Sequence, residues 1–472
     1  MSAQPEAAAE PRRWDRDAFL SDLGDVPVQS EPALVKQKSR DFYWYSPILK
    51  PQLDRKFADL LVVPRSIDDV IRIAKACVRH KVPVTARGGG TGNYGQAVPL
   101  EGGIILDTTR LDRVLWLKDG VVRVECGKKM TESDLETQKQ GWEYRMHPST
   151  KRTATVGGFI AGGSGGVGSI GWGVLRDRGN IHGLKLVTFE AEPRFIELRG
   201  DDVQWANHAY GVNGIIVELE LPMAPARPWI EALVAFGDAA TAMNFCQAFA
   251  EHDAIVKKEC AFVDWPITTY FKPIRQYCPD NQPVAIVMVN RSCMAAFKDL
   301  VASFKGEITL ERECVETGGT IPLYEYTWNH TTLQGLKVDK SITYLQTLFP
   351  AGRNIELMLH MKEKFGDEVM IHGEFVRTGG KVTNSALQMV RYTTKERLYE
   401  IIRYHEGMGC RIADPHTYIL EDGGKKAADL GQLRLKYETD PHGLLNPGKM
   451  RAWIEAQAKG IKRAEDVEKL VA

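Results

Sequence analysis

Residues 87–95 read Arg-Gly-Gly-Gly-Thr-Gly-Asn-Tyr-Gly, and a second stretch further along the chain places nine glycines within residues 157–173. Glycine packs no side chain and loses much backbone entropy on folding, so this density does not suit a core. It suits a backbone that approaches a ligand closely and directs several N–H groups at it. The two stretches therefore predict a long anionic cofactor that lies between two loops.

Two enzyme classes share formal motifs with these stretches, and neither fits. Residues 90–95 match GxGxxG, but a Rossmann site needs a helix directly after the turn. Here a proline-containing loop and a predicted strand, 104–107, follow instead. Residues 162–166 match the GxSxG elbow of serine hydrolases, which needs a strand before it and a helix after it. Because glycines flank this segment on both sides, we expect no helix there, and a serine hydrolase is disfavoured.

Length and composition indicate a protein with two domains. The chain has 472 residues, zero formal net charge and eight cysteines without a CxxC pair. Its length exceeds that of one ordinary core, and zero net charge gives no general attraction for nucleic acid or anionic membranes. Scattered cysteines suit a reducing compartment. No secretory signal or membrane-spanning stretch is recognisable, so we expect a cytoplasmic enzyme with no nucleic-acid partner; peripheral attachment through a partner stays open.

Local patterns predict a mixture of helices and strands before and between the loops. The clearest helix begins after Ser66, a capping residue, and runs to about His80 with apolar positions three and four apart. A second helix is expected from the Thr131 cap to near Gly141. The strands are expected at 60–64, 82–87, 104–107, 121–126, 185–190, 194–198 and 214–222.

Residues 60–222 resemble the FAD-binding domain of the vanillyl-alcohol oxidase/p-cresol methylhydroxylase (PCMH) flavoprotein family. The motifs that carry the resemblance are Val63-Pro64-Arg65-Ser66, residues 87–92, Gly103-Ile104-Ile105-Leu106-Asp107, Val124-Glu125-Cys126-Gly127, Pro148-Ser149, Thr155-Val156-Gly157-Gly158 and residues 211–215. Residues 440–449, Asp-Pro-His-Gly-Leu-Leu-Asn-Pro-Gly-Lys, resemble the closing motif of the D-lactate dehydrogenase/glycolate oxidase branch. The resemblance implies an α+β, two-domain FAD-linked oxidase fold.

The resemblance also implies a domain plan and a set of cofactor contacts. An N-terminal extension (1–55) would precede a PCMH-type FAD-binding domain (56–227), a substrate or cap domain (228–425) and a C-terminal segment (426–472) that returns to the FAD domain. Backbone of 88–93 and 156–163 would lie on the pyrophosphate and ribityl, and Ile215 on the adenine side. The implied cofactor-binding residues are Arg87, Gly88, Gly89, Gly90, Thr91, Gly92, Asn93, Pro148, Ser149, Thr155, Val156, Gly157, Gly158, Ile160, Ala161, Gly162, Gly163, Gly214, Ile215 and Asn446.

Departures from the family pattern bear on how FAD is attached and on whether a metal is present. Residues 87–96 contain no histidine and residues 145–173 near the second loop contain no cysteine, so noncovalent FAD is expected. A histidine from the substrate domain stays open as an attachment point. The metal-bearing histidine and aspartate segment of the related 2-hydroxy-acid dehydrogenases is missing. We therefore expect no metal, and a simple lactate substrate is in doubt.

The second half of the chain alternates predicted strands and helices. Strands are expected at 229–236, 284–290 and 307–315, and helices at 238–252 and 292–305. Two strand–helix–strand units indicate an antiparallel sheet with helices on one face.

Three clusters in this half supply candidate catalytic residues, because oxidation of an alcohol needs a base for the hydroxyl proton. The first, residues 324–332, contains Tyr326 and His330, and His330 is equally compatible with a hydrogen-bonded histidine in a half-buried strand. In the second, alternation on a strand puts His372 and Glu374 on one face and Arg377 opposite, where the His–Glu pair is either base and orienter or a surface ladder pair. In the third, His416 and Tyr418 would share a strand face. The seven candidates are Tyr326, His330, His372, Glu374, Arg377, His416 and Tyr418.

Three functions remain open. The first is an FAD-dependent oxidoreductase that oxidises a CH–OH group of a hydroxy acid or other alcohol by hydride transfer to flavin N5, with a quinone, cytochrome or O2 as electron acceptor. The second oxidises a phenolic or benzylic substrate, which paired tyrosines around the flavin would support. The third is a subunit that holds FAD for electron transfer in a complex. Each of these functions requires a small-molecule substrate or a redox partner. Assembly of the protein into a homo-oligomer stays open.

Overall fold

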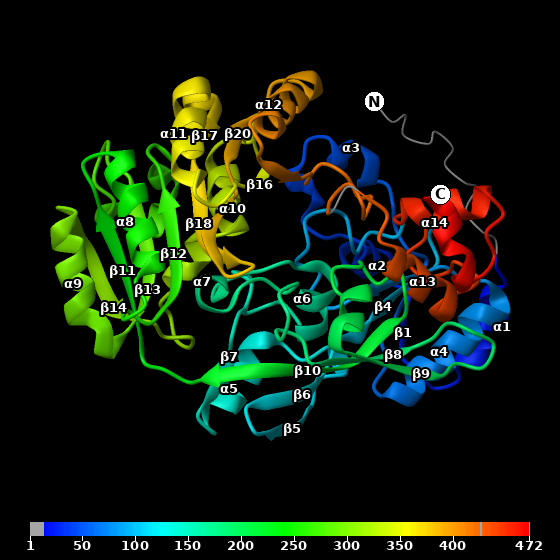
Figure 1. Cartoon of the computed structure of the whole chain (residues 1–472). Coiled ribbons are helices and arrows are strands. Elements are labelled where there is room, and N and C mark those ends of the chain that lie inside the picture. The colour runs from blue at the N-terminus through cyan, green and yellow to red at the C-terminus, as the bar shows by residue number, and fades with distance from the viewer. Residues whose placement is uncertain (1–13, 425–426, 472) are drawn as a thin grey trace.

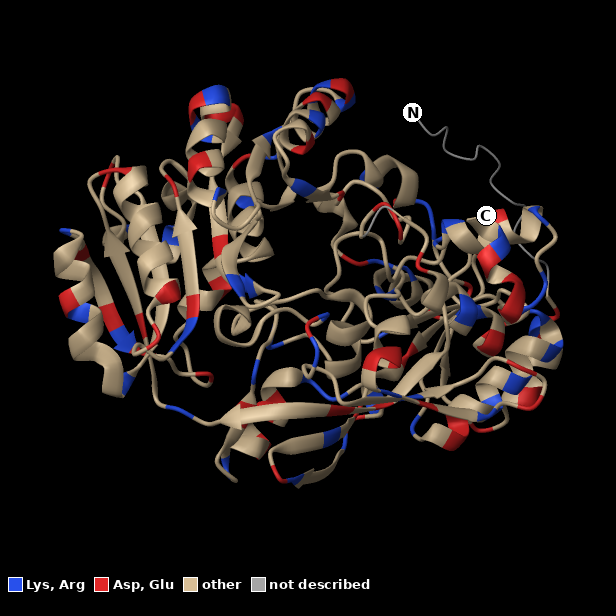
Figure 2. Cartoon of the chain, in the orientation of Figure 1, with Lys and Arg blue, Asp and Glu red and all other residues tan. Residues whose placement is uncertain are grey.

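The protein is described here by a computed structural model of residues 14–424 and 427–471, and its strands form two groups that occupy opposite ends of the molecule (Figure 1). Strands β1–β10 and β11–β21 follow one another along the chain without mixing between the groups. Lysine, arginine, aspartate and glutamate are interspersed over both ends (Figure 2), in keeping with the zero net charge.

The first group forms a parallel core sheet and an antiparallel sheet. The first sheet has the order β1-β2-β4-β3, with β2, β4 and β3 parallel, and the second has the order β5-β6-β10-β8-β9, with β7 also paired to β10. The strands are β1 (Val28–Gln29), β2 (Leu60–Val62), β3 (Val84–Arg87), β4 (Ile104–Asp107), β5 (Val114–Lys118), β6 (Val121–Glu125), β7 (Trp142–Tyr144), β8 (Gly183–Val187), β9 (Phe195–Arg199) and β10 (Ile215–Pro225).

The helices of this half are α1 (Arg16–Leu23), α2 (Pro32–Lys38), α3 (Leu49–Leu53), α4 (Ile67–His80), α5 (Met130–Gln138), α6 (Val156–Gly162) and α7 (Ser169–Trp172). The Ser66 side chain accepts a hydrogen bond from Asp69 N, as its capping position predicts. After α4 the chain enters β3, the first glycine loop and then β4, so no helix follows the loop and the rejection of a Rossmann site is confirmed.

Two expectations for the helices here are wrong. Helix α5 begins at Met130 rather than after Thr131, and its N-cap Lys129 makes no side-chain cap. The second glycine stretch contains α6 and α7, although its glycine content predicted no helix. Helix α6 forms because Thr155 caps it and because Val156 and Ile160 bury apolar side chains in the core, which outweighs the entropy cost of its glycines. The GxSxG serine still follows a helix rather than a strand, which leaves no nucleophile elbow.

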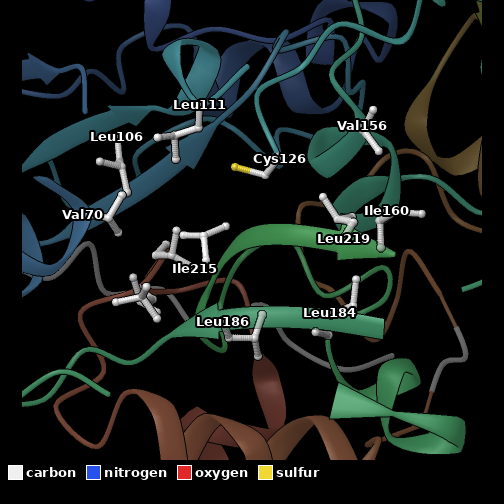
Figure 3. Close-up of a cluster of buried hydrophobic side chains, with 14 of the residues drawn as sticks. Val70, Leu106, Leu111, Cys126, Val156, Ile160, Leu184, Leu186, Ile215 and Leu219 are labelled. Carbon is white, nitrogen blue, oxygen red and sulfur yellow. The ribbon is translucent and has the colours of Figure 1, made fainter. Parts of the chain in front are cut away.

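The core of this half joins both sheets to α6. Figure 3 shows side chains of Val70, Leu106, Ile215 and Leu219 in one cluster with Val156 and Ile160, and all of them are buried. Burial of each such side chain contributes on the order of 1.5–3 kcal/mol. Packing of this cluster therefore fixes the position of α6, and with it the second glycine stretch, against the sheets.

The second group forms an eight-stranded antiparallel sheet of order β14-β11-β13-β12-β18-β19-β16-β21 and a three-stranded sheet of order β15-β20-β17. Helices α8, α9 and α11 contribute phenylalanine, leucine and methionine side chains to one core cluster with the larger sheet, so the expected antiparallel sheet with covering helices is confirmed. The strands are β11 (Trp229–Ala235), β12 (Lys257–Val263), β13 (Val284–Asn290), β14 (Glu307–Glu313), β15 (Ile342–Tyr344), β16 (Gln346–Leu348), β17 (Val369–Met370), β18 (His372–Thr378), β19 (Lys381–Ala386), β20 (Met389–Arg391) and β21 (Arg411–Ala413), and the helices are α8 (Ala239–Glu251), α9 (Met294–Ser303), α10 (Asn329–Val338), α11 (Asn354–Phe365) and α12 (Lys395–Gly407).

The C-terminal segment, with α13 (Leu430–Thr439) and α14 (Arg451–Ala458), lies back against the first half (Figure 1). Val84 N donates to Leu444 O at 2.8 Å, and Asn446 N donates to Val84 O at 2.7 Å. The buried Lys449 ammonium donates to the carbonyl oxygens of Gly95, Gln96 and Val98. The segment thus holds the strand before the first glycine loop and the chain directly after it.

Candidate active site

The two glycine stretches face each other across a cavity of about 250 Å³ that reaches the second half of the molecule. Of the cofactor-binding residues predicted from the sequence, Val156, Ile160 and Asn446 do not line it: the first two belong to the core, and Asn446 bonds Tyr210 O and Gln96 O. The predicted residues that line the cavity are Arg87, Gly88, Gly89, Gly90, Thr91, Gly92, Asn93, Pro148, Ser149, Thr155, Gly157, Gly158, Ala161, Gly162, Gly163, Gly214 and Ile215.

Missing side chains allow the two stretches to approach each other. A Cβ on Gly88 would lie 2.0 Å from Thr155 Oγ1, and one on Gly89 would lie 2.2 Å from Thr153 O. Gly90 has φ +65°, a conformation that other residues rarely adopt. Gly88 and Gly89 are therefore required by close contact with residues 153–155, whereas the close approach to a ligand stays a prediction.

Free N–H groups distinguish the first stretch from the start of α6. Within residues 14–424 and 427–471, the N–H groups of Gly89, Gly90, Thr91 and Gly92 have no protein acceptor, so the loop offers them to a ligand. At the start of α6, by contrast, the N–H groups of Val156 and Gly157 donate to Lys128 O and Cys126 O, and that of Gly158 donates to Thr155 Oγ1. The first loop thus fits the negatively charged phosphates of a dinucleotide, whereas α6 supplies a surface rather than donors.

Five residues of the second half close the other side of the cavity: Trp328, Asn329, Gln346, Ser385 and Leu387, together called the cap-side wall. Tyr94 of the first loop donates a hydrogen bond to Gln346, which joins the two sides. The Asn329 side-chain oxygen is buried and has no hydrogen-bond partner among the described residues.

Three bulky residues on the cavity have left-handed backbones: His208 (φ 52°), Tyr210 (φ 53°) and Trp328 (φ 51°). Such conformations cost on the order of 1–3 kcal/mol each and cluster at functional sites. His208 and Tyr210 were not among the residues predicted from the sequence, and Trp328 lies in the predicted cluster 324–332, where Tyr326 and His330 were the candidates. His208 and Tyr210 directly precede the recognised motif 211–215, and that position was the available signal.

His208 is held as a neutral imidazole of one tautomer. Its Nδ1 lies 3.0 Å from Gly163 O, and burial lowers its pKa to about 4. A carbonyl oxygen only accepts, so Nδ1 carries the proton and Nε2 keeps a lone pair. His208 therefore presents an acceptor for a proton or a hydrogen bond at the cavity.

Two buried glutamates fix Trp328 from behind. Trp328 N donates to Glu374 Oε1 at 2.6 Å, and the indole N–H donates to Glu259 Oε1 at 3.2 Å. Burial raises the pKa of Glu374 to about 7 and that of Glu259 well above its ordinary range, the latter also because Glu374 lies beside it. One carboxyl of the pair is therefore protonated near neutral pH, and the indole is held at both of its hydrogen-bonding groups.

None of the seven catalytic candidates from the sequence lines the cavity within the part of the chain that the structure describes. His372 and Glu374 share a strand face as predicted, with Nε2 and Oε1 2.8 Å apart, but both are buried, so the surface ladder alternative is wrong. Burial lowers the pKa of His372 to about 4, which keeps it neutral. Arg377 donates to the carbonyl oxygens of Ile170 and Ala250 rather than to a carboxylate.

The other candidates differ from expectation in their local structure. His330 lies in helix α10, not in a strand, because the chain turns into the helix at Trp328; its Nδ1 is 3.8 Å from Glu325 Oε2. Tyr326 is buried in a short 3-10 helix, Leu323–Tyr326, against Phe271.

His416 and Tyr418 lie in a loop after β21, since the turn at Pro415 ends the strand. Both ring nitrogens of His416 are occupied, by Ser46 Oγ and Tyr344 O, and Tyr418 packs beside Gly95. A catalytic role for any of the seven stays a prediction.

No cluster of three or more His, Cys, Asp or Glu side chains in residues 14–424 and 427–471 is arranged to hold a metal ion. Among the same residues, no helix has the length and apolar character needed to cross a membrane.

Comparison with known proteins assigns the first half to a domain family. Residues 58–193 match the FAD binding domain family. The chain is 30% identical over 188 residues to a D-lactate dehydrogenase of Anaerostipes hadrus, which covers 37% of this chain and 38% of the relative. It is 31% identical over 145 residues to the glycolate oxidase subunit GlcD of Bacillus subtilis, which covers 30% of each chain. The matches thus span between 30% and 38% of the length of these relatives.

The fold of the whole chain is similar to that of an alkyldihydroxyacetonephosphate synthase, with a TM-score of 0.69 and 15% identity over 93% of this chain and 86% of the other. This likeness confirms the α+β, two-domain fold class. The glycine loops, their free N–H groups and the matched domain agree with one another. Residues 58–193 therefore form an FAD binding domain with FAD as its cofactor, and both glycine stretches lie within it.

Proposed function

We propose that the protein is an FAD-dependent oxidoreductase that oxidises a CH–OH group of a hydroxy acid or another alcohol. The observation that carries the proposal is one continuous cavity, lined by the glycine stretches on one side and by the cap-side wall on the other. When bound, FAD supplies a two-electron acceptor for hydride at flavin N5. The names of the relatives, a D-lactate dehydrogenase and a glycolate oxidase subunit, support an alcohol as the reduced substrate.

His208 is our candidate for the group that takes the hydroxyl proton. Its Nε2 carries a lone pair, the ring is fixed through Gly163 O, and it is neutral at physiological pH. A positioned base of this kind contributes about 10²–10⁴-fold to a proton-transfer step. Its low pKa makes it a weak base in the resting protein, so we expect it to act as a hydrogen-bond acceptor that takes the proton as the hydride leaves.

The test is reduction of the FAD-loaded protein in the absence of oxygen. A panel of 2-hydroxy acids and primary alcohols is added, and bleaching of the flavin band near ~450 nm, a property of the cofactor itself, is followed. At least one alcohol is expected to bleach the band, and His208→Phe is expected to slow that step by about 10²-fold or more while FAD stays bound. Loaded protein that no alcohol reduces contradicts the proposal and favours a subunit that holds FAD for electron transfer.

A second candidate, oxidation of a phenolic or benzylic substrate, is favoured by one observation. Tyr94 and Tyr210 both line the cavity, and the Tyr210 hydroxyl is buried without a hydrogen-bond partner among the described residues. Paired phenolic hydroxyls would bond a substrate hydroxyl. Slower bleaching by a benzylic alcohol in Tyr210→Phe, with no change for an aliphatic hydroxy acid, would select this candidate.

We propose further that FAD is held without a covalent bond. Cys126 lines the cavity, but burial raises the pKa of its thiol to about 12, so it is not a nucleophilic thiolate. His208 lines the cavity, so it is the histidine that could carry a covalent bond to FAD. Acid precipitation of the protein should release the yellow cofactor into the supernatant; a yellow pellet would show a covalent link.

A further inference from the structure

The cap-side wall contains no ionisable side chain. Trp328, Asn329, Gln346, Ser385 and Leu387 offer an indole, two amides, a hydroxyl and an isobutyl group. A substrate group that leaves water to lie on this wall meets hydrogen-bonding and apolar partners and no cation. Burial of an unpaired carboxylate is costly, whereas an amide or hydroxyl can be satisfied by these side chains.

The ionisable groups directly behind Trp328 are acids or neutral. Glu259 and Glu374 hold Trp328, and His372, next to Glu374, is neutral. Their charge, where there is any, is negative, so their field opposes an anion on the wall.

Among the described residues, Arg87 is the cation that lines the FAD side of the cavity, and it is already engaged. A second arginine, Arg176, lies near His208, Asp429 and Arg411 and does not line the cavity. Arg87 Nη1 donates to Arg40 O at 2.6 Å, and the guanidinium lies near the carboxylates of Asp41 and Asp107. It also directly precedes the loop whose N–H groups are free for phosphate.

The cap-side wall also has an acceptor atom that lacks a hydrogen-bond donor. The buried Asn329 side-chain oxygen has no partner among the described residues, and a hydroxyl or amide N–H can supply one while a carboxylate cannot. Beside it, the Trp328 ring is fixed at its backbone N–H and its indole N–H, which makes it a rigid aromatic surface.

We propose that the substrate is an uncharged alcohol whose planar or apolar group packs on Trp328 and Leu387 and which donates a hydrogen bond to Asn329, rather than a free hydroxy acid. The inference rests on the proposed alcohol oxidation and narrows it. It runs against the hydroxy-acid chemistry in the names of the relatives.

The decisive experiment compares mandelamide with mandelate, which share the phenyl and CH–OH groups and differ in the charge of one substituent. With FAD-loaded protein in the absence of oxygen, the second-order rate constant for flavin bleaching is expected to be at least ~10-fold higher for mandelamide, because the carboxylate finds no cation on the wall. Equal rates, or a preference for mandelate, would overturn the proposal.

A binding measurement separates failure of this inference from failure of the proposed function. Benzamide and benzoate are titrated into the loaded protein, and the shift of the bound flavin spectrum gives each Kd. If neither mandelamide nor mandelate bleaches the flavin, the result contradicts the proposed alcohol oxidation. Tighter binding of benzamide than of benzoate would still support an uncharged ligand. Tighter benzoate, equal affinities, or no binding of either compound overturns it.

A positive charge introduced into the cap-side wall should shift the relative affinity from benzamide toward benzoate. Ser385→Lys places an ammonium at the half-buried end of β19, and we expect benzoate to gain affinity relative to benzamide by ~10-fold or more. Ser303→Lys, on the exposed end of α9, adds the same charge outside the cavity and should leave the ratio unchanged. If Ser385→Lys does not fold, the two ligand pairs on the unaltered protein still decide the question.

Discussion

The two sides of the cavity are built on opposite physical principles. The glycine stretches work through the absence of side chains: the backbone at Gly88 and Gly89 comes so close to residues 153–155 that a single Cβ would collide. The N–H groups of residues 89–92 have no acceptor among the described residues. The cap-side wall works through side chains, and Trp328 is held in a left-handed backbone conformation by two buried carboxyl groups.

The difference teaches how each side can fail. The glycine side is disrupted by adding an atom, because interiors packed to this density cannot move aside. The wall is disrupted by changing a charge or a proton, because the buried glutamates tolerate only certain protonation states. Each side can therefore be tested with a substitution that should leave the other intact.

The largest change in stability is expected for an ion pair that links the two halves of the molecule. Lys151, 1% exposed, lies just before the second glycine stretch; its ammonium pairs with Asp134 at 2.6 Å and with Glu316 of the second half. Lys151→Met leaves the buried Asp134 carboxylate without its cation and should lower the free energy of unfolding by about 3–5 kcal/mol. Urea unfolding measures this, with Lys118→Met, on the exposed strand β5, as the matched control. A loss of less than about 1 kcal/mol would mean that the ion pair does not join the halves.

The second prediction, a loss of stability and of FAD content, tests the glycine side of the cavity alone. Gly89→Ala puts a Cβ 2.2 Å from Thr153 O, a backbone atom that cannot rotate away. We expect a loss of about 1–3 kcal/mol in stability, and purified protein that retains little FAD because the first loop is displaced. Gly407→Ala is the control, since its Cβ would meet no atom within 4 Å. Full FAD content in Gly89→Ala would show that close contact between the stretches is not needed.

The contrast also explains what could be predicted from the sequence. The glycine side depends on local backbone geometry, so most of its lining residues could be named from the resemblance to the FAD-binding domain of the PCMH-type family. Likewise Ser66 marks the start of α4, and alternation places His372 and Glu374 on one face.

The wall could not be predicted in this way. Trp328, Gln346 and Ser385 come from three separate elements, and their meeting depends on how the sheet around β18 and β19 packs against α10. His208 could have been found, because it stands just before a recognised motif. Helix α6 was missed because burial of Val156 and Ile160 overrides the low helix propensity of glycine.

A smaller, pH-dependent effect tests the wall. In the folded protein burial raises the pKa of Glu374 to about 7 from its ordinary 4.5, so the folded state keeps a proton that the unfolded chain releases. The contribution of this proton to stability is full below about pH 4.5 and is lost as the pH rises to about 7. Glu374→Gln, a neutral mimic of the protonated acid, should therefore show a flatter fall in the free energy of unfolding between pH 5 and pH 8.

Urea unfolding at several pH values compares the two proteins, and only their difference is assigned to Glu374, because Lys449 and Asp41 also titrate unusually. Glu368→Gln, in a partly exposed ion pair with Arg397, is the matched control. Parallel curves for the unaltered protein and Glu374→Gln would contradict a shared proton behind Trp328.

The smallest effect returns to the glycine side and asks what holds α6 in place. Thr155 Oγ1 accepts the N–H of Gly158 at 3.2 Å, and Thr155→Ala should cost about 1 kcal/mol through loss of this cap. Thr155→Ser keeps the hydroxyl and should recover most of the loss. Because the N–H groups at the start of α6 are already satisfied within the protein, saturating FAD should stabilise the alanine variant and the unaltered protein by similar amounts. If FAD instead restores the alanine variant selectively, the cofactor itself must accept from the Gly158 N–H, and the first loop would lose its standing as the main donor to the phosphates.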